Sequence, residues 1–462
     1  MSKPPSISNG NMTAKLTKGS ITGHLVGQTL PAVIGVAAIM SIGLVDAYFI
    51  GQLGPEALAA IAFIFPVTVA LSSLGVGVMV GINSVVARAL GEGDGPRCAR
   101  RANFGLVFSV VIGIIIGALL FALSGPLFAL MNAPEHLRGL ILDYMHPFAI
   151  GFPLILAIMG FNGVLRGQGE AKRTSYISIT YAAANWVLDP ILITGAFGFE
   201  GYGIAGAAYA TIIGYLIGVV MAFMLLRQTD LPLDLSLLRE GSWVDPAAAI
   251  LRVAGPASFS NSINPIGLSV LTAIIATQGE AAVAAFGAAG RLQGLATVPL
   301  LALSGSIGAI VGQNWGAREY DRARQAALYA FGFCLVWGLA LVAVTVPMAG
   351  SFARLFSDEP RIIEQFVLYI EIAAWGYAGF GVLIVSNGIL NAIDRASFAL
   401  SQSAARVFLV MLPFAWFLLP SWSSAAVYSA ELSANIFGGL TGAVLAYWLL
   451  ARKSPDKIAS PA

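Results

Sequence analysis

The sequence has few charged residues, few histidines and almost no cysteine. Only 10% of its 462 residues are Asp, Glu, Lys or Arg, whereas 58% are hydrophobic, and the mean hydropathy is +0.83. This balance excludes a soluble globular protein, because such domains carry about 25% charged residues. We therefore expect an all-α polytopic membrane protein.

The missing residue types also exclude several kinds of site. Cys98 and Cys334 form no Cys-x-x-Cys motif, so neither a disulfide framework nor a thiolate metal site is expected. The three histidines form no His-Glu-x-x-His motif, and the absence of a Walker motif leaves ATP-driven transport by this chain alone unsupported. Gly75, Gly77 and Gly81 lie in an apolar run without a preceding strand, which favours close helix packing over a nucleotide loop. An enzyme is not expected.

Long apolar runs, in contrast, recur along the whole chain. A membrane-spanning helix needs about 20 apolar residues. We predict twelve spans, over residues 25–50, 57–83, 102–124, 138–165, 174–196, 203–226, 248–275, 282–312, 325–350, 361–391, 397–420 and 424–450. No signal-peptide cleavage pattern precedes the first span, so we expect that span to remain in the mature protein.

Basic residues lie mainly in alternate loops. Arg138, Arg354 and Arg361 fall on one side and Arg291 falls within a span, whereas the other Lys and Arg residues fall on the opposite side. Because Lys and Arg concentrate in cytoplasmic loops, we predict cytoplasmic tails at 1–24 and 452–462 and a cytoplasmic linker at 227–247. The basic clusters are interpreted as topology determinants rather than as a nucleic-acid patch.

The two halves of the sequence are copies of one another. An offset of 225 residues aligns Pro31 to Ala171 with the second half without a gap, and the matches include the motif Asn-Gly-x-Leu at 162 and at 387. Six predicted spans separate equivalent points, so the copies have the same orientation in the membrane. We predict two pseudo-symmetric six-helix bundles, an N-lobe at 25–226 and a C-lobe at 248–451.

Two aspartates lie within these apolar segments, in the first copy only. At the same offset, Asp46 corresponds to Leu271 and Asp189 to Phe414. The fold itself therefore does not require the acids. A charge within the bilayer is costly and usually marks a proton or ion site, so Asp46 and Asp189 are the principal candidate functional residues.

The predicted fifth span carries a polar stripe around Asp189. Tyr181, Asn185 and Asp189 are spaced i, i+4 and i+8, which places them on one face of a helix. Pro190 follows directly and removes a backbone donor, so carbonyl oxygen is expected near the carboxylate. A site rich in oxygen suits a proton or a hard cation such as Na⁺.

Three further polar residues are candidates for the interior of the same lobe. These are Tyr144, Asn162 and Thr211. Hydrogen bonding between helices, worth about 0.6 kcal/mol per bond in a membrane, is the alternative role for each. Asn162 has a counterpart in Asn387, which favours a structural role common to both copies.

Three motifs give the sequence a family resemblance. They are Leu-Val-Asp-Ala-Tyr-Phe-Ile-Gly-Gln-Leu-Gly at 44–54, Asn-Gly-Val-Leu-Arg-Gly-Gln-Gly-Glu at 162–170 and Asn-Trp-Val-Leu-Asp-Pro at 185–190. With twelve spans in two halves, the chain resembles the multidrug and toxic compound extrusion (MATE) family over nearly its whole length. The resemblance implies a cation-coupled antiporter that expels organic, often cationic and lipophilic compounds, with its two bundles in a V-shaped arrangement.

Within that family the chain is more similar to the DinF-like branch. The resemblance implies a coupling site for H⁺ or Na⁺ in the N-lobe at Asp46, Asn185, Asp189 and Thr211, with Tyr144, Asn162 and Tyr181 lining the polar network. Thr211 is preferred over Ala207 for the sixth span. Members like NorM also carry acids in spans 7 and 10, but span 7 here has none, and the span 10 position is Phe380, with Glu371 as a weak substitute.

The sequence thus predicts a secondary efflux antiporter of the bacterial inner membrane. Its expected partners are small organic substrates and the lipid bilayer, with no cofactor beyond the coupling ion, no nucleic acid and a monomeric state. A flippase for lipid or polysaccharide precursors is an alternative, although it should line its cavity with several cations, and Arg291 is the only obvious one within a span. A passive channel or scaffold is a second alternative. An intramembrane aspartyl hydrolase would need two facing carboxylates that share a water.

Overall fold

The computed structural model describes residues 13–196, 198–239 and 242–452, which are helical with no strand among them. Within those ranges, 11 helices are long and apolar enough to cross a membrane, and there are 12 if the pair Glu280–Ala296 and Val298–Gly316, bent by 45°, counts as one span. The predicted all-α fold class is confirmed. Most of the predicted tails, residues 1–12 and 453–462, lies outside the described residues.

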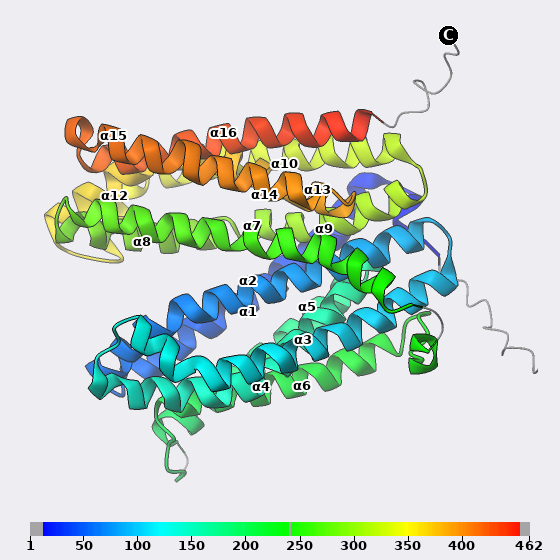
Figure 1. The fold of residues 1–462 in the computed structure, drawn as a ribbon. Coiled ribbons are helices and arrows are strands. Elements are labelled where there is room, and N and C mark those ends of the chain that lie inside the picture. Colours follow the sequence, from blue (N-terminus) through cyan, green and yellow to red (C-terminus); the bar gives the residue numbers. More distant parts are fainter. Residues whose placement is uncertain (1–12, 197, 240–241, 453–462) are drawn as a thin grey trace, which may run out of the picture. The chain divides into compact units, whose positions relative to one another are not determined.

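The first half of the chain forms six long helices and their connections (Figure 1). In chain order the elements are η1 (Lys15–Thr17), α1 (Ile21–Gly51), α2 (Pro55–Gly91), α3 (Gly95–Leu130), α4 (Glu135–Gly167), α5 (Ala171–Asp189), η2 (Pro190–Thr194), α6 (Ile204–Leu226) and η3 (Leu235–Leu238).

The second half is divided into more pieces, because one of its spans is bent and others are interrupted by the short elements η4 and η5. Its elements are α7 (Val244–Ala276), α8 (Glu280–Ala296), α9 (Val298–Gly316), α10 (Tyr320–Thr345), α11 (Ala349–Arg354), α12 (Pro360–Ala373), η4 (Ala374–Gly376), α13 (Tyr377–Ala392), α14 (Ala396–Ala404), η5 (Ala405–Met411), α15 (Leu412–Trp422) and α16 (Ser424–Ala451).

The chain forms two compact units. Unit 1 comprises Met1–Lys15 and Pro31–Ser258, and unit 2 comprises Leu16–Leu30 and Phe259–Ala462. Helices α1 and α7 therefore each contribute residues to both units. Pro31 in α1 and Pro256 in α7 lie at these changes of unit, where a proline weakens the helix by removing a backbone hydrogen bond.

Helix α4 forms the centre of unit 1. In its most apolar stretch 72% of the residues are buried, compared with 22% for α2 and for α3. Small residues allow its neighbours to come close, because a Cβ atom on Gly113 of α3 would lie 2.7 Å from the Cα atom of Pro153 in α4. Helices α2, α3 and α6 pack around α4, and their outer faces carry exposed apolar side chains suited to lipid.

The duplicated sequence produces duplicated packing. A Cβ atom on Gly163 would lie 2.7 Å from the carbonyl oxygen of Met79, and a Cβ atom on Gly388 would lie 2.6 Å from that of Ser304. Gly163 and Gly388 are 225 residues apart, and so are Met79 and Ser304. Gly54 and its counterpart Gly279 likewise share positive φ angles of 111° and 105°. The offset read from the sequence is therefore reproduced in the structure.

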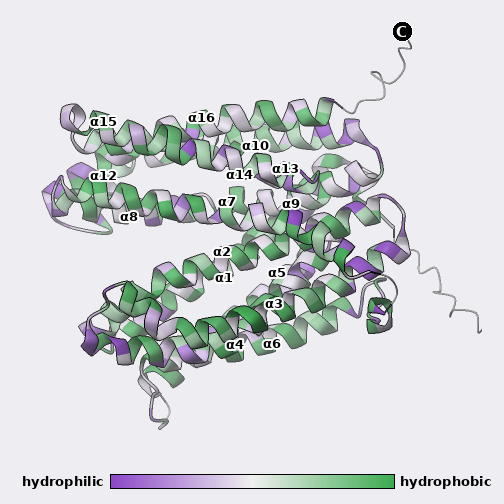
Figure 2. Ribbon diagram, in the orientation of Figure 1, coloured by the Kyte–Doolittle hydropathy of each residue, from purple (hydrophilic) through white to green (hydrophobic). Residues whose placement is uncertain are grey.

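Polar residues lie mainly at the ends of the helices. Figure 2 shows hydrophilic segments concentrated at helix ends and loops, with apolar residues along most of each helix. In unit 1, Asn103 fixes the segment after α6 by donating to the carbonyl oxygen of Pro232 at 2.8 Å and accepting from the backbone N–H of Asp234 at 3.1 Å. This connection is therefore held against α3.

Candidate functional site

Asp189 is the last residue of α5, and Pro190 determines the local structure that follows it. Proline has no N–H and cannot donate to the carbonyl of Trp186 one turn earlier. The chain continues as a wider helical turn, η2, whose carbonyl at Pro190 accepts from the Thr194 hydroxyl at 2.9 Å and from the N–H of Ala196 at 3.2 Å. The Asp189 carboxyl group is thus placed at an irregular point of the helix and is completely buried.

Asp46, on α1, lies beside Asp189. The two carboxyl groups are close enough to interact directly, and Asp46 is half-buried. Among the described residues, no hydrogen-bond partner reaches Oδ1 of Asp46 or either carboxyl oxygen of Asp189. Two adjacent carboxylates repel each other in a buried site, and a shared proton or a bound cation removes this repulsion.

Tyrosine and amide side chains surround the acid pair. Tyr144 on α4 and Tyr215 on α6 both lie within electrostatic range of Asp46. The Asn185 side-chain amide lies 3.5 Å from the Thr211 hydroxyl, and the rings of Tyr181 and Tyr215 are 5.0 Å apart. The site is therefore assembled from α1, α4, α5 and α6 of unit 1.

The arrangement offers oxygen atoms for a small ion. Asn185 Oδ1, one helical turn before Asp189, is buried and, like Oδ1 of Asp46 and both oxygens of Asp189, has no hydrogen-bond partner within the described part of the chain. The Tyr181 hydroxyl instead interacts with Ser178 and Arg166. Carboxylate and amide oxygens are ligands preferred by hard cations, and a carboxyl pair can equally hold a proton. The chemistry of the site fits H⁺ or Na⁺.

The structure distinguishes among the residues chosen from the sequence. It brings Asp46, Asp189 and Tyr144 together, and it joins Asn185 to Thr211. Asn162 is buried in unit 1, but the stretch of α4 from Tyr144 to Asn162 is about 27 Å long at 1.5 Å per residue. One ion cannot contact both residues, so Asn162 lies outside the acid cluster.

Two residues near acidic groups were missed in the sequence. Tyr215 follows Thr211 by four residues on α6, and this i, i+4 spacing is the signal that could have revealed it. Glu431 is a single acid within the apolar run of α16 and is 1% exposed. Its counterpart at the offset of 225 is Gly206, so comparison of the two copies gave no polar match.

The C-lobe positions considered from the sequence lack a carboxylate site. Leu271 is buried, and Phe380 packs under the guanidinium group of Arg406, 5.3 Å from its ring centre. Glu371 and Arg291 are both exposed in unit 2. The acid of this unit that is enclosed by polar partners is Glu431.

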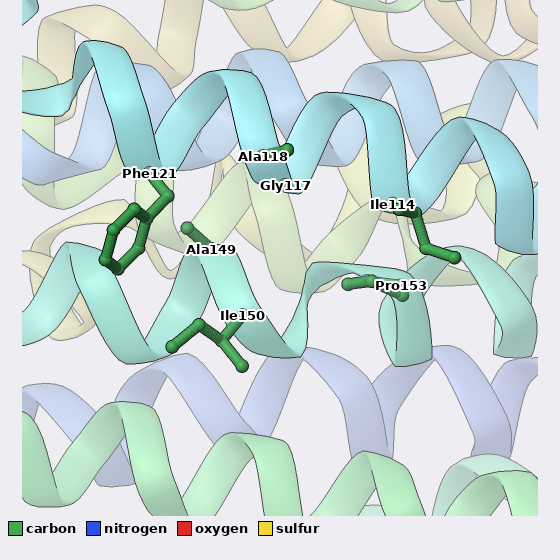
Figure 3. Close-up of a pocket in the computed structure, with 7 residues that line it drawn as sticks. All are labelled: Ile114, Gly117, Ala118, Phe121, Ala149, Ile150 and Pro153. Atoms are coloured by element: carbon green, nitrogen blue, oxygen red, sulfur yellow. The ribbon is translucent and has the colours of Figure 1, made fainter.

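A separate apolar groove lies between α3 and α4. It has a volume of about 380 Å³, and Figure 3 shows its lining side chains, which are Ile114, Gly117, Ala118, Phe121, Ala149, Ile150 and Pro153. None of these side chains is polar, and Ile150 is 70% exposed. The groove fits a lipid acyl chain rather than a polar ligand, and it contains none of the candidate site residues.

Replacing Tyr181 with phenylalanine is expected to leave the melting temperature of the purified protein unchanged or raised. The ring would keep its packing against Tyr215, while a buried hydroxyl without a close hydrogen bond, which costs about 1–3 kcal/mol, is removed. Tyr428→Phe is the matched control, because it removes a hydroxyl that donates to Gln365 Oε1 at 3.1 Å and should lower the melting temperature. A lower value for Tyr181→Phe alone would show that its hydroxyl has a stabilising partner.

The bundles of long apolar helices define a membrane protein, and the family that its sequence matches consists of transporters rather than enzymes. The sequence matches the MatE family over residues 31–191 and again over 256–417, at nearly the repeat offset. The chain belongs to the MatE family, which confirms the predicted family, while the DinF-like branch remains a prediction. It is a multi-pass membrane protein.

Individual relatives agree with this placement. The chain is 35% identical over 396 residues to a Shewanella oneidensis protein named FAD transporter, covering 85% of this chain and 86% of that protein. It is 25% identical over 434 residues to the multidrug resistance protein PmpM of Pseudomonas aeruginosa, covering 91% and 89%. The crystal structure of a mutant of the Vibrio cholerae MATE transporter VcmN is similar, with a TM-score of 0.89, 27% identity and coverage of 96% and 99%.

Proposed function

We propose that this protein is a secondary antiporter that exports organic compounds in exchange for H⁺ or Na⁺ bound between Asp46 and Asp189. The supporting observation is the adjacent carboxyl pair, in which Asp189 is buried and neither Asp46 Oδ1 nor either oxygen of Asp189 has a donor among the described residues. A passive channel has no need for two adjacent buried acids, and their absence from the second copy argues against a role in the fold. We further propose a monomer in the bacterial inner membrane with both termini cytoplasmic.

The proposed coupling acts through α1. An ion entering between the carboxylates removes their mutual repulsion and allows the segment of α1 around Asp46 to pack against the end of α5. Helix α1 continues through Pro31 into residues of unit 2. Helix α1 therefore connects the ion site covalently to the second unit. A change in its bend at Pro31 would transmit ion binding to that unit, and alternating access requires such a connection.

The available energy is sufficient for this exchange. A single proton that crosses about 100 mV and one pH unit releases roughly 2.3 plus 1.4, or about 3.7 kcal/mol. This energy can sustain a substrate gradient of about 500-fold. One ion per transport cycle is thus enough for effective export.

There are two candidate classes of substrate. Several relatives are named multidrug resistance proteins, which favours lipophilic organic cations. The Shewanella oneidensis relative is named FAD transporter and has higher identity, 35% against 25% for PmpM, which favours a flavin dinucleotide as the second candidate. The two differ in charge, because FAD carries a pyrophosphate.

Transport in liposomes tests the proposed function and separates these substrates. The purified protein is reconstituted with ethidium or with FAD, and a pH gradient or a Na⁺ gradient is imposed. We expect substrate movement against its gradient that stops when the ion gradient is collapsed. Movement that persists, always down the substrate gradient, would instead identify a channel. When both compounds are present, the one that inhibits transport of the other at the lower concentration is the preferred substrate class.

A further inference from the structure

Glu431 of α16 is part of a closed triangle of polar side chains in unit 2. Its Oε1 accepts a hydrogen bond from Gln293 Nε2 on α8 at 2.6 Å, and its Oε2 lies 2.9 Å from the hydroxyl oxygen of Tyr369 on α12. That hydroxyl also lies 3.2 Å from Oε1 of Gln293. The three side chains thus make three mutual contacts, each of hydrogen-bond length.

The number of protons in this triangle depends on the charge of Glu431. The Gln293 amide supplies one N–H and the Tyr369 hydroxyl supplies one proton, so an ionised carboxylate leaves two protons for three contacts. A protonated Glu431 supplies the third. Its O–H then donates to the Tyr369 oxygen, the Tyr369 hydroxyl donates to Gln293 Oε1, and the Gln293 N–H donates to Glu431 Oε1. Only the protonated acid satisfies the whole triangle.

The surroundings also provide for the ionised form. Arg406, on η5, is 3% exposed and within electrostatic range of Glu431. Its guanidinium group donates to Oδ1 of Asn435 at 2.6 Å and to Oδ1 of Asn264 at 2.8 Å, which are neutral acceptors. A buried cation whose partners are two neutral amides and the ring of Phe380 stabilises a carboxylate nearby. Both charge states of Glu431 therefore have a stabilising partner.

The remaining titratable groups around Glu431 are tyrosines from three elements. Tyr369 belongs to α12 and Tyr377 to α13, and both interact electrostatically with Glu431. The hydroxyl of Tyr377 is buried beside that of Tyr369. Tyr428, on α16 itself, packs its ring 5.2 Å from that of Tyr369.

The repeat gives independent support. Tyr369 is the counterpart of Tyr144 at the offset of 225 residues. Tyr144 lies beside Asp46 and Asp189 in unit 1, and the Tyr369 hydroxyl lies 2.9 Å from Glu431 Oε2 in unit 2. Each copy thus places the same tyrosine beside a buried acid, although the acid comes from a different helix. The second copy therefore has a buried acid beside this tyrosine, namely Glu431.

We propose that Glu431 binds and releases a proton, forming a second protonation site of the transporter within unit 2. Its use in transport rests on the proposed ion-coupled function, whereas its protonation does not. The Gln293–Glu431–Tyr369 triangle holds the proton, and Arg406 stabilises the carboxylate after the proton has left. Substrate exchange then draws on proton binding in unit 2 as well as on the ion bound in unit 1.

Infrared spectroscopy of the purified protein tests the protonation directly. The spectrum of the wild type minus that of Glu431→Gln should contain the carbonyl band of a protonated carboxylic acid, replaced by carboxylate bands as the pH is raised. Tyr369→Phe should shift this band, because it removes one hydrogen bond to the acid. Glu364→Gln is the control, because Glu364 is an exposed acid on the same helix as Tyr369. At neutral pH this substitution should change the carboxylate bands and leave the band of the protonated acid unchanged. Carboxylate bands at every pH, or an acid band that never titrates while the protein stays folded, would overturn the proposal.

Liposome transport tests the use of the proton. Each coupled proton contributes a factor of about 10 to the sustained substrate gradient per pH unit, so Glu431→Gln should lower that gradient about tenfold under a gradient of one unit. An unchanged gradient overturns the role of Glu431 in coupling but leaves the proposed function intact. Full transport by both Asp189→Asn and Asp46→Asn defeats the proposed function instead, and the infrared result for Glu431 stands independently of it.

Discussion

Replacing Asp189 with asparagine is expected to abolish ion-driven efflux. The asparagine has nearly the same volume, so α5 and its bend at Pro190 should remain, but the site loses the negative charge that binds H⁺ or Na⁺. The lost coupling corresponds to about 3.7 kcal/mol per proton, so the part of the substrate gradient that this ion sustains, roughly 500-fold, should be lost. The measurement is accumulation of ethidium or FAD in liposomes under an imposed gradient. Asp46→Asn should give the same result.

The control for this prediction is another acid of unit 1. Asp143 lies on α4 next to Tyr144 in the sequence, but its side chain is exposed. Asp143→Asn should retain the wild-type gradient, because the residue is not part of the buried pair. Full transport by both Asp189→Asn and Asp46→Asn, at equal protein in the membrane, would contradict the proposed coupling site.

Replacing Gly379 with leucine is expected to prevent unit 2 from assembling. A Cβ atom at this position of α13 would lie 2.4 Å from the carbonyl oxygen of Asn435 and 2.8 Å from its carbonyl carbon, both in the backbone of α16. Backbone atoms cannot rotate away, so the two helices would have to separate. Overpacking usually costs about 1–3 kcal/mol, and a full leucine against backbone should exceed that range. The measurement is the yield of monodisperse protein in fluorescence-detected size exclusion.

Gly332→Leu is the matched control for the packing prediction. A Cβ atom on Gly332 of α10 has no neighbouring atom within 4 Å, so the same change meets open space. Leucine also favours helix by nearly 1 kcal/mol relative to glycine. Its yield should equal or exceed that of the wild type. Equal yields for Gly379→Leu and Gly332→Leu would show that α13 and α16 do not require the close contact.

Much of the fold was predictable because the bilayer limits what a chain can do. Backbone polar groups in lipid must be satisfied internally, so each apolar run of sufficient length becomes a helix. The repeat was also visible in the sequence. Glycine recurs at 163 and at 388 because each position lies against the backbone of a neighbouring helix, where a larger residue does not fit. The prediction treated each span as continuous, but the structure bends residues 280–316 by 45° and interrupts other spans of the second half at η4 and η5.

The candidate site was predictable only in part. Asp46, Asp189 and Asn185 stood out because polar residues in an apolar run have few structural uses. Tyr215 did not, since tyrosine is also common as a packing or interface residue in membrane helices. Glu431 was missed because its counterpart in the first copy, Gly206, is not polar, and the second copy carries its acid on another helix. Each copy can thus place an acid beside the equivalent tyrosine from a different position in the sequence.

The sequence by itself determined that this protein spans a membrane, that it is duplicated, and that its first half carries two costly acids. These properties follow from composition, spacing and the free energy of moving charge into lipid, which depend on local sequence alone. Only the tertiary structure decided that the two acids are adjacent, that Asn162 lies outside their cluster, and that Glu431 forms a triangle with Gln293 and Tyr369. Such contacts join residues up to 143 positions apart, from Asp46 to Asp189, and they arise from helix packing, which no local pattern specifies.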